Sequence, residues 1–119
     1  MLNEVPVDRV YLASGITDMR KSIDGLAVLV QEVFELDPFS SNLFVFCNRK
    51  RDKLKILYWD KNGFWLYYRR LERGHFQWPS NDHGSTPLKI TRRQLHWLLD
   101  GLSLEQKQAH PEVMARTII

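Results

Sequence analysis

The sequence contains a single cysteine, Cys47, among its 119 residues. One cysteine cannot form an intrachain disulfide, and it argues against a metal site built from cysteines. No apolar stretch approaches the roughly 18 residues of a membrane-spanning helix, and the N-terminus lacks the basic start and apolar segment of a signal peptide. These absences predict a cytoplasmic protein that folds without a membrane, a disulfide or a metal.

The groupings that carry enzyme chemistry are also missing. The four histidines show no metal-ligand spacing, and Asp18 and Asp24 would lie on different faces of a helix with 3.6 residues per turn. Gly15 and Gly25 stand alone, so there is no glycine-rich phosphate loop. The sequence therefore predicts no catalytic residue, no metal and no cofactor.

What is present is the composition of one ordinary globular domain. Hydrophobic residues make up 44% and charged residues 26% of the chain, which is typical of a protein with a single packed core. We expect one domain over residues 1–102. Apolar residues become sparse after Leu102, so residues 103–119 are predicted to be a partly mobile tail.

Hydrophobic periodicity predicts an α+β fold, an antiparallel β-meander of four to five strands packed with two helices. Met19, Ile23, Leu26, Val30 and Val33 recur at helical spacing and indicate one long helix over residues 18–36. Thr91 with Gln94 three residues later predicts a capping box that starts a short helix over 91–101. Strands are expected at residues 9–13, 43–48, 54–60, 64–71 and 75–78.

Positive charge is concentrated in the middle of the chain. Residues 49–73 contain nine Lys and Arg against three Asp and Glu, whereas residues 1–48 contain three against seven. Such a local excess attracts polyanions, although it could also be a solvated turn that protects a sheet edge. The residues predicted to contact DNA are Arg49, Lys50, Arg51, Lys53, Lys55, Arg69, Arg70 and Arg73.

Aromatic side chains follow the basic run. Trp59, Trp65 and Tyr67 are candidates for stacking on bases or for binding a protein partner. Packing in the core is the alternative, because aromatic residues are favoured in strands for that reason alone.

Four segments in order resemble one known family, at residues 15–26, 37–40, 54–60 and 70–79. They are similar to TnpB, the accessory protein from the second open reading frame of insertion-sequence-66 transposons, which is distinct from the RNA-guided nuclease of that name. The resemblance covers roughly residues 8–102. It implies a role in DNA transposition beside a separate transposase, and it supplies no catalytic residue.

One of the resembling motifs, Thr17 to Lys21, places two cations at the expected start of the long helix. Arg20 and Lys21 oppose the helix dipole there, so we consider an anion site formed by Thr17, Arg20 and Lys21. The alternative is that Asp18 offsets their charge.

Two functions are compatible with these features. The first is a non-catalytic accessory protein that binds transposon DNA through the central basic hairpin and assists the transposase. The second is an adaptor that binds the transposase or the element's companion accessory protein without touching DNA. Neither predicts the oligomeric state, and neither involves a membrane.

Overall fold

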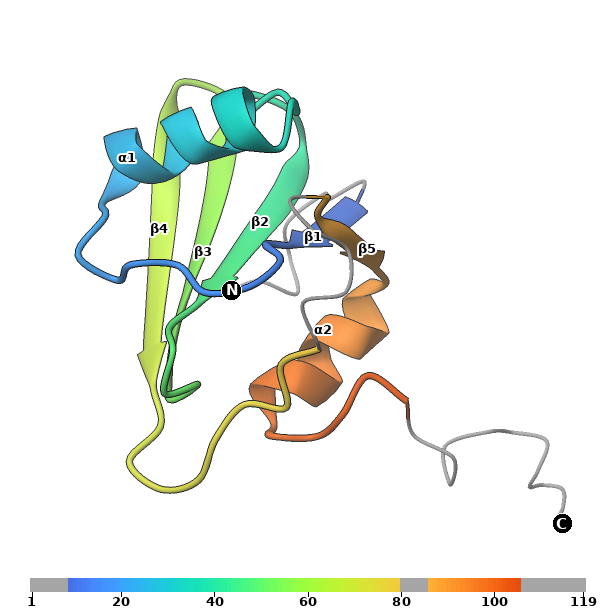
Figure 1. Ribbon diagram of the computed structural model, residues 1–119. Coiled ribbons are helices and arrows are strands. Elements are labelled where there is room, and N and C mark those ends of the chain that lie inside the picture. Colours follow the sequence, from blue (N-terminus) through green and yellow to red (C-terminus); the bar gives the residue numbers. More distant parts are fainter. Residues whose placement is uncertain (1–8, 80–85, 106–119) are drawn as a thin grey trace, which may run out of the picture.

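The computed structural model describes residues 9–79 and 86–105 of the chain, which form a five-stranded sheet and two helical segments (Figure 1). The strand order is β4-β3-β2-β1-β5. The elements in chain order are β1 (Arg9–Leu12), α1 (Ile23–Val28), the π-helical turn η2 (Leu29–Val33), β2 (Asn42–Cys47), β3 (Lys53–Asp60), β4 (Gly63–Arg70), β5 (Leu88–Ile90) and α2 (Arg92–Leu99).

The sheet is mixed, which corrects the expectation of a purely antiparallel meander. β2, β3 and β4 do form the predicted antiparallel meander, but β1 pairs with β2 in parallel, with Arg9 opposite Asn42 and Leu12 opposite Val45. Parallel neighbours need a long crossover, and here α1 and η2 supply it. β5 then pairs antiparallel with the free side of β1.

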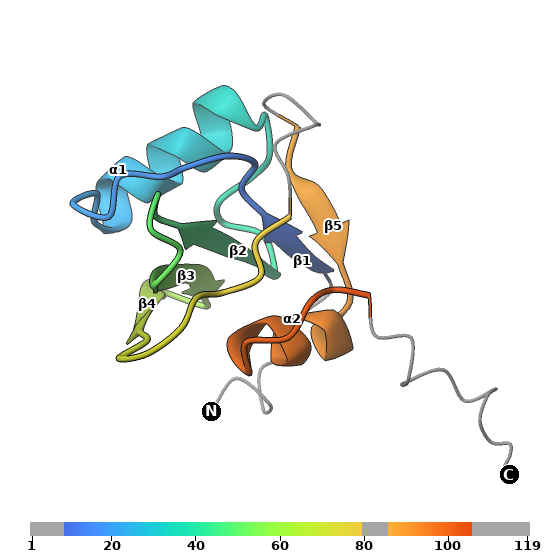
Figure 2. The ribbon, with the colours of Figure 1, turned by 60° about the horizontal axis from the view of Figure 1, so that its bottom comes forward.

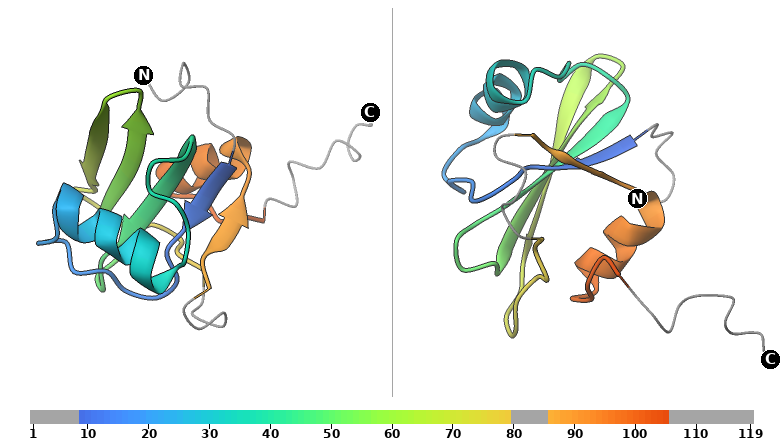
Figure 3. Two further views of the ribbon diagram at one scale, coloured as in Figure 1. Left: turned by 90° about the horizontal axis from the view of Figure 1, so that it is seen from above. Right: turned by 45° about the vertical axis from the view of Figure 1, so that its right-hand side comes forward.

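Each face of the sheet is covered by one helix, so the molecule has three layers (Figures 2 and 3). Leu26 and Val30 of the first helical segment pack against Phe44, Phe46 and Leu57. On the opposite face, α2 packs on alternate residues of the same strands. This second core contains Val10, Leu12, Leu43, Val45, Cys47, Leu54, Ile56, Tyr58, Phe76, Trp78, Ile90, Leu95 and Leu98. Burial on both faces explains why neither side of the central strands reads as polar.

The first helix is shorter than predicted because its expected first turn is used for tertiary contacts. Thr17 is 5% exposed and its N–H donates to the carbonyl of Cys47 at 2.8 Å. The ammonium of Lys55 donates to the carbonyls of Met19 and Lys21, both at 2.8 Å. These bonds hold residues 17–21 outside the helix, which therefore begins at Ile23 and ends, as η2, at Val33.

The strand predicted at residues 75–78 is also wrong. This segment is irregular, and its aromatic residues, Phe76 and Trp78, are buried in the α2-side core. The fifth strand is instead Leu88–Ile90. Large apolar residues at alternate positions favour a strand, whereas here they anchor a loop in the core.

The second helix forms as predicted. The N–H of Gln94 donates to Oγ1 of Thr91 at 3.1 Å, and the N–H of Thr91 donates to Oε1 of Gln94 at 2.9 Å, which completes the capping box. Leu104 packs against the same core, so the predicted tail begins in contact with the domain. Residues 106–119 lie outside the described residues, and the mobility of the tail stays a prediction. None of the helices in the described part could cross a bilayer.

Replacing Lys55 tests the contact that sets the start of the first helix. Lys55→Met keeps the aliphatic stem but removes both bonds to backbone carbonyls, and we expect the free energy of unfolding to fall by about 1.5 to 3 kcal/mol. Urea denaturation measures the change. Lys53→Met is the matched control, since Lys53 lies on the same face of β3 without such bonds, and it should change stability by no more than about 0.5 kcal/mol. Equal effects of the two variants would contradict the assignment.

Candidate nucleic-acid interface

The tight turn between β2 and β3 is organised by Asn48. Its side-chain oxygen accepts the N–H groups of Asp52 and Lys53 at 3.1 and 3.0 Å, and its amide donates to Oδ1 of Asp52 at 2.8 Å. The backbone of Arg51 adopts a left-handed conformation with φ of 60°. These bonds fix the backbone of the turn. Its exposed side chains are those of Arg49, Lys50 and Arg51.

The loop after β4 is bonded to this turn at three points. The N–H of Leu71 donates to the carbonyl of Asp52 at 2.8 Å, and the N–H of Phe76 donates to the carbonyl of Arg51 at 2.7 Å. Nδ1 of His75 lies 2.9 Å from the carbonyl of Lys50, so this nitrogen carries the proton. Because Phe76 is itself 1% exposed, the loop that carries Arg73 is anchored to both the core and the turn.

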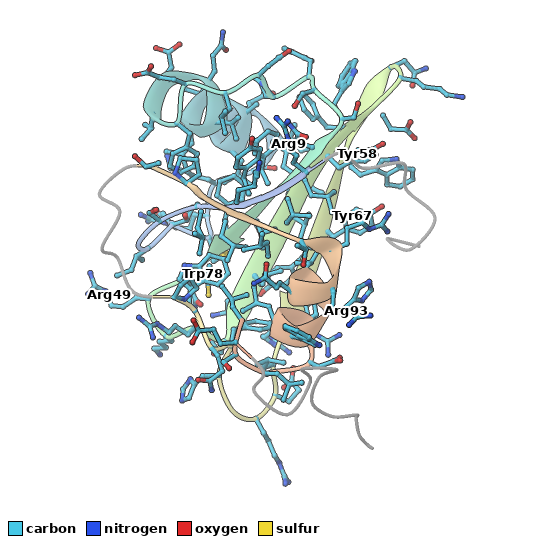
Figure 4. All side chains as sticks on the ribbon, turned by 90° about the vertical axis from the view of Figure 1, so that its right-hand side faces the viewer. Arg9, Arg49, Tyr58, Tyr67, Trp78 and Arg93 are labelled. Atoms are coloured by element: carbon cyan, nitrogen blue, oxygen red, sulfur yellow. The ribbon has the colours of Figure 1, made fainter. Side chains whose placement is uncertain are left out.

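The same end of the sheet receives cations from two strands. Lys53 pairs with Arg70, and Leu54 pairs with Arg69, so the cationic ends of β3 and β4 lie side by side next to the turn. Alternation puts Lys53 and Arg70 on the α1 face and Arg69 on the α2 face. We call this assembly the basic end; it consists of Arg49, Lys50, Arg51, Lys53, Arg69, Arg70 and Arg73. Figure 1 shows the turn and the loop together at this end of the sheet, and Figure 4 shows Arg49 at the periphery.

Most of this charge is not neutralised by neighbours. Arg70 forms an exposed ion pair with Glu72 at 2.9 Å, and this contact raises the pKa of Arg70. The other six cations of the basic end make no ion pair within residues 9–79 and 86–105. The hydrogen bond from Asn48 lowers the pKa of Asp52, whose carboxylate is thereby committed to the turn. The basic end is therefore available to an external anion.

Lys55 belongs to the predicted set but has a different environment. Its ammonium is held by the carbonyls of Met19 and Lys21 and lies 5.8 Å from the centre of the Tyr68 ring. Two of its three donors are thus used within the protein. We therefore leave Lys55 out of the basic end and treat it as a support for the loop beside it.

The helix start proposed as an anion site does not lie at Thr17, because the helix begins at Ile23. Thr17 is buried, and Arg20 makes a two-pronged contact with Asp18, with the shortest N to O distance at 2.7 Å. Hydrogen bonding to Arg20 lowers the pKa of Asp18 to about 2. The alternative reading, in which Asp18 offsets the charge, fits this geometry, and anion binding by Arg20 and Lys21 stays a prediction.

The three candidate aromatics do not form one surface. Trp59 lies on the α1 face in a cluster with Phe39 and Phe64, with ring centroids 4.9 Å from each. Trp65 lies on the opposite face, stacked on Tyr67 at 6.2 Å. Trp59 and Trp65 are near the β3–β4 turn, about 20 Å along the strands from the basic end. A nucleic acid that stacks on either ring and also contacts the basic turn must therefore run along about 20 Å of the sheet.

The sequence predicted the charged residues of the basic end but not the residues that hold its backbone in place. Asn48, His75 and Phe76 hold the turn and the loop together, and only the Asn48–Asp52 spacing is a recognisable turn signal.

A cavity of about 140 Å³ also opens beside the turn, lined by Gly15, Ile16, Asn48, Arg51, Trp78 and Pro79. The indole N–H of Trp78 is buried and finds no acceptor in the described part of the chain.

The described residues offer neither a group of metal ligands nor a reactive thiol. No three His, Cys, Asp or Glu side chains among residues 9–79 and 86–105 lie close enough to hold a metal ion. Burial raises the pKa of the Cys47 thiol to about 11, which keeps it protonated and unreactive near neutral pH.

A comparison with known protein families supports the resemblance seen in the sequence motifs. The family model described as IS66 Orf2 like protein matches residues 8–109. The chain belongs to this family. It is accordingly a transposition-associated accessory protein, which confirms the family resemblance seen in its motifs, and the family is not a known catalytic one.

Two relatives extend over nearly the same length. Uncharacterized protein y4hO of Sinorhizobium fredii (strain NBRC 101917 / NGR234) is 43% identical over 100 residues, covering 84% of this chain and 85% of the relative. Uncharacterized protein y4jC of the same strain is 30% identical over 103 residues, covering 87% and 86%. No solved structure gives a significant match to the chain.

The Asp18 carboxyl provides a direct test of the loop before α1. Its pKa is lowered to about 2 from the ordinary 3.8, so the ionised form stabilises the fold above about pH 4 and this contribution is lost as the pH falls toward 2. We expect NMR titration of the carboxyl carbon to show this value. Arg20→Gln should return the pKa toward 3.8, and an unchanged pKa in that variant would show that Arg20 is not the cause.

Proposed function

We propose that this accessory protein binds transposon DNA through the basic end and thereby assists the separate transposase, without a catalytic step of its own. The observation that carries the proposal is a set of six cations from two strands, a turn and a loop at one end of the sheet. Five of them are exposed, Lys53 is half-buried, and none has an ion-pair partner within residues 9–79 and 86–105. Transposition places DNA in reach of such a surface.

The chemistry of the basic end fits the DNA backbone better than base edges. Lys and Arg bind phosphates by charge and release condensed counterions, which supplies affinity without sequence information. The cations of the basic end belong to two strands, a turn and a loop, and none of them belongs to a helix that could enter a groove. The expected binding is consequently salt-dependent and weakly sequence-specific.

The fixed backbone of the β2–β3 turn favours DNA binding over the alternative of a charged turn that is merely solvated. Turns that serve only to keep a sheet edge soluble need no fixed geometry. Here the backbone beneath Arg49, Lys50 and Arg51 accepts bonds from His75 and Phe76 of a distant segment. Because the backbone is already fixed, only side-chain entropy is lost when these cations meet phosphates, which favours binding.

Neutralising the turn provides the test. If six cations meet phosphates, log affinity should fall with log salt with a slope of about −5, and Arg49→Gln, Lys50→Gln, Arg51→Gln combined should reduce this to about −3. Fluorescence anisotropy with labelled duplex from the element's end measures both slopes.

A variant with the same charge change elsewhere controls for net charge. Lys61→Gln, Lys89→Gln and Arg93→Gln combined removes three exposed cations away from the basic end, and Figure 4 places Arg93 on the opposite side from Arg49. This variant should keep the original slope. Equal loss in both triple variants would show that only net charge matters, and no binding by the unmodified protein at low salt would refute direct DNA contact.

The aromatic cluster on the α1 face favours a second function, that of an adaptor for the transposase or the companion accessory protein. Phe39 is 55% exposed although it packs on Trp59 and Phe64, at 4.9 and 5.4 Å between ring centroids. An exposed aromatic held by two others is typical of an interface anchor. The cluster lies at the end of the sheet opposite the basic end, so both functions are compatible.

Removing the anchor distinguishes the two functions. Phe39→Ala should weaken binding of purified transposase about 30-fold, the equivalent of a 2 kcal/mol interface anchor. DNA affinity should be unchanged, because the cations are untouched. Surface plasmon resonance with each partner in turn measures both. Unchanged transposase affinity would contradict the adaptor function at this site.

A further inference from the structure

The outer edge of β4 is a row of backbone groups that no other strand among residues 9–79 and 86–105 pairs with. β4 has eight residues and is the outermost strand of the sheet beside β3 (Figure 1). The Leu71 N–H donates to the Asp52 carbonyl in the β3–β4 register, so the hydrogen-bonded pairs alternate from there along the ladder. The N–H and C=O groups of Phe64, Leu66, Tyr68 and Arg70 therefore point away from β3.

Within the described part of the chain, this edge lacks the usual protection against pairing. Edge strands are commonly short, or interrupted by proline or charge. β5, at the other edge, has only three residues. β4 carries charge only at its end, in Arg69 and Arg70, and its exposed aromatics Trp65 and Tyr68 are 48% and 53% accessible on opposite faces.

We propose that β4 pairs antiparallel with β4 of a second copy of this chain, on a two-fold axis at Tyr67. In this register Leu66 lies opposite Tyr68 of the second copy and Phe64 lies opposite Arg70. All four outward-facing residues of each strand are then bonded, giving about eight inter-chain hydrogen bonds, two for each pair. Faces are preserved, since opposite residues differ by an even number, and a continuous ten-stranded sheet results.

Charge and length identify the occupant as a second copy. Antiparallel pairing places Arg69 opposite Trp65 of the other chain, where a guanidinium can lie over the indole. Trp65 itself donates to Asp60 at 3.4 Å, so the arginine also approaches a carboxylate. The two basic ends come to lie at opposite ends of the joined sheet, which avoids the repulsion that a parallel arrangement would create. An equal length of eight residues leaves no part of the edge unpaired.

Engineered cysteines test the register. Residues opposite each other in a non-hydrogen-bonded pair have Cα atoms about 4.5 Å apart, within disulfide range, so Tyr67→Cys should form a covalent dimer on mild oxidation. Trp65→Cys is the control on the same face: the two copies of residue 65 would be offset by about 13 Å, too far to bridge. Native Cys47 is buried and does not compete. Free thiol at residue 67 after oxidation, or equal crosslinking at both positions, would overturn this register.

The mass of the unmodified chain provides a test that needs no variant. Light scattering across a concentration series should give twice the chain mass. Tyr68→Pro removes an N–H that β3 does not use and should give a monomer, whereas Tyr68→Ala removes the same ring but keeps the N–H and should stay dimeric. A monomer at every concentration for the unmodified protein would refute the proposal, whatever the result for DNA binding.

Discussion

The backbone of the β2–β3 turn is held by hydrogen bonds from a segment more than twenty residues further along the chain, and the shape of the basic end depends on this contact. Phe76 donates to Arg51 while its ring is buried among the residues beneath α2. One residue thereby links the core to the charged surface. Asn48 fixes the same turn from within. Cations that would repel one another on a mobile loop are kept close together by these neutral bonds.

Local signals predicted the parts of the fold that local interactions build. The neighbouring strands expected at residues 54–60 and 64–71 and the Thr91 cap of α2 could be predicted because each depends on residues close together in the sequence. The start of α1 was not, because the ammonium of Lys55, some 35 residues away, binds the carbonyls that a longer helix would have used. The parallel pairing of β1 with β2 was implicit in the strand-helix-strand order but was not inferred.

The candidate site likewise has features that the sequence predicts and features that depend on tertiary contacts. A run of cations is visible in any sequence. Six of the eight predicted residues lie at one end of the sheet without an ion-pair partner in the described part of the chain, five of them exposed and Lys53 half-buried. Sequence alone could not separate Lys55, whose charge is used inside the protein, from Lys53, whose charge is not. Nor could it show that Trp59 and Trp65 face opposite ways, because alternation along two paired strands becomes definite only once their register is known.

Contact between the basic end and DNA can be mapped by recording amide spectra of the isotope-labelled protein during titration with duplex DNA from the element's end. We expect the largest shifts on residues 48–53 and 69–76, which form one surface only in the folded structure. Shifts centred on Phe39, Trp59 and Phe64, or spread evenly over all exposed lysines and arginines, would contradict it.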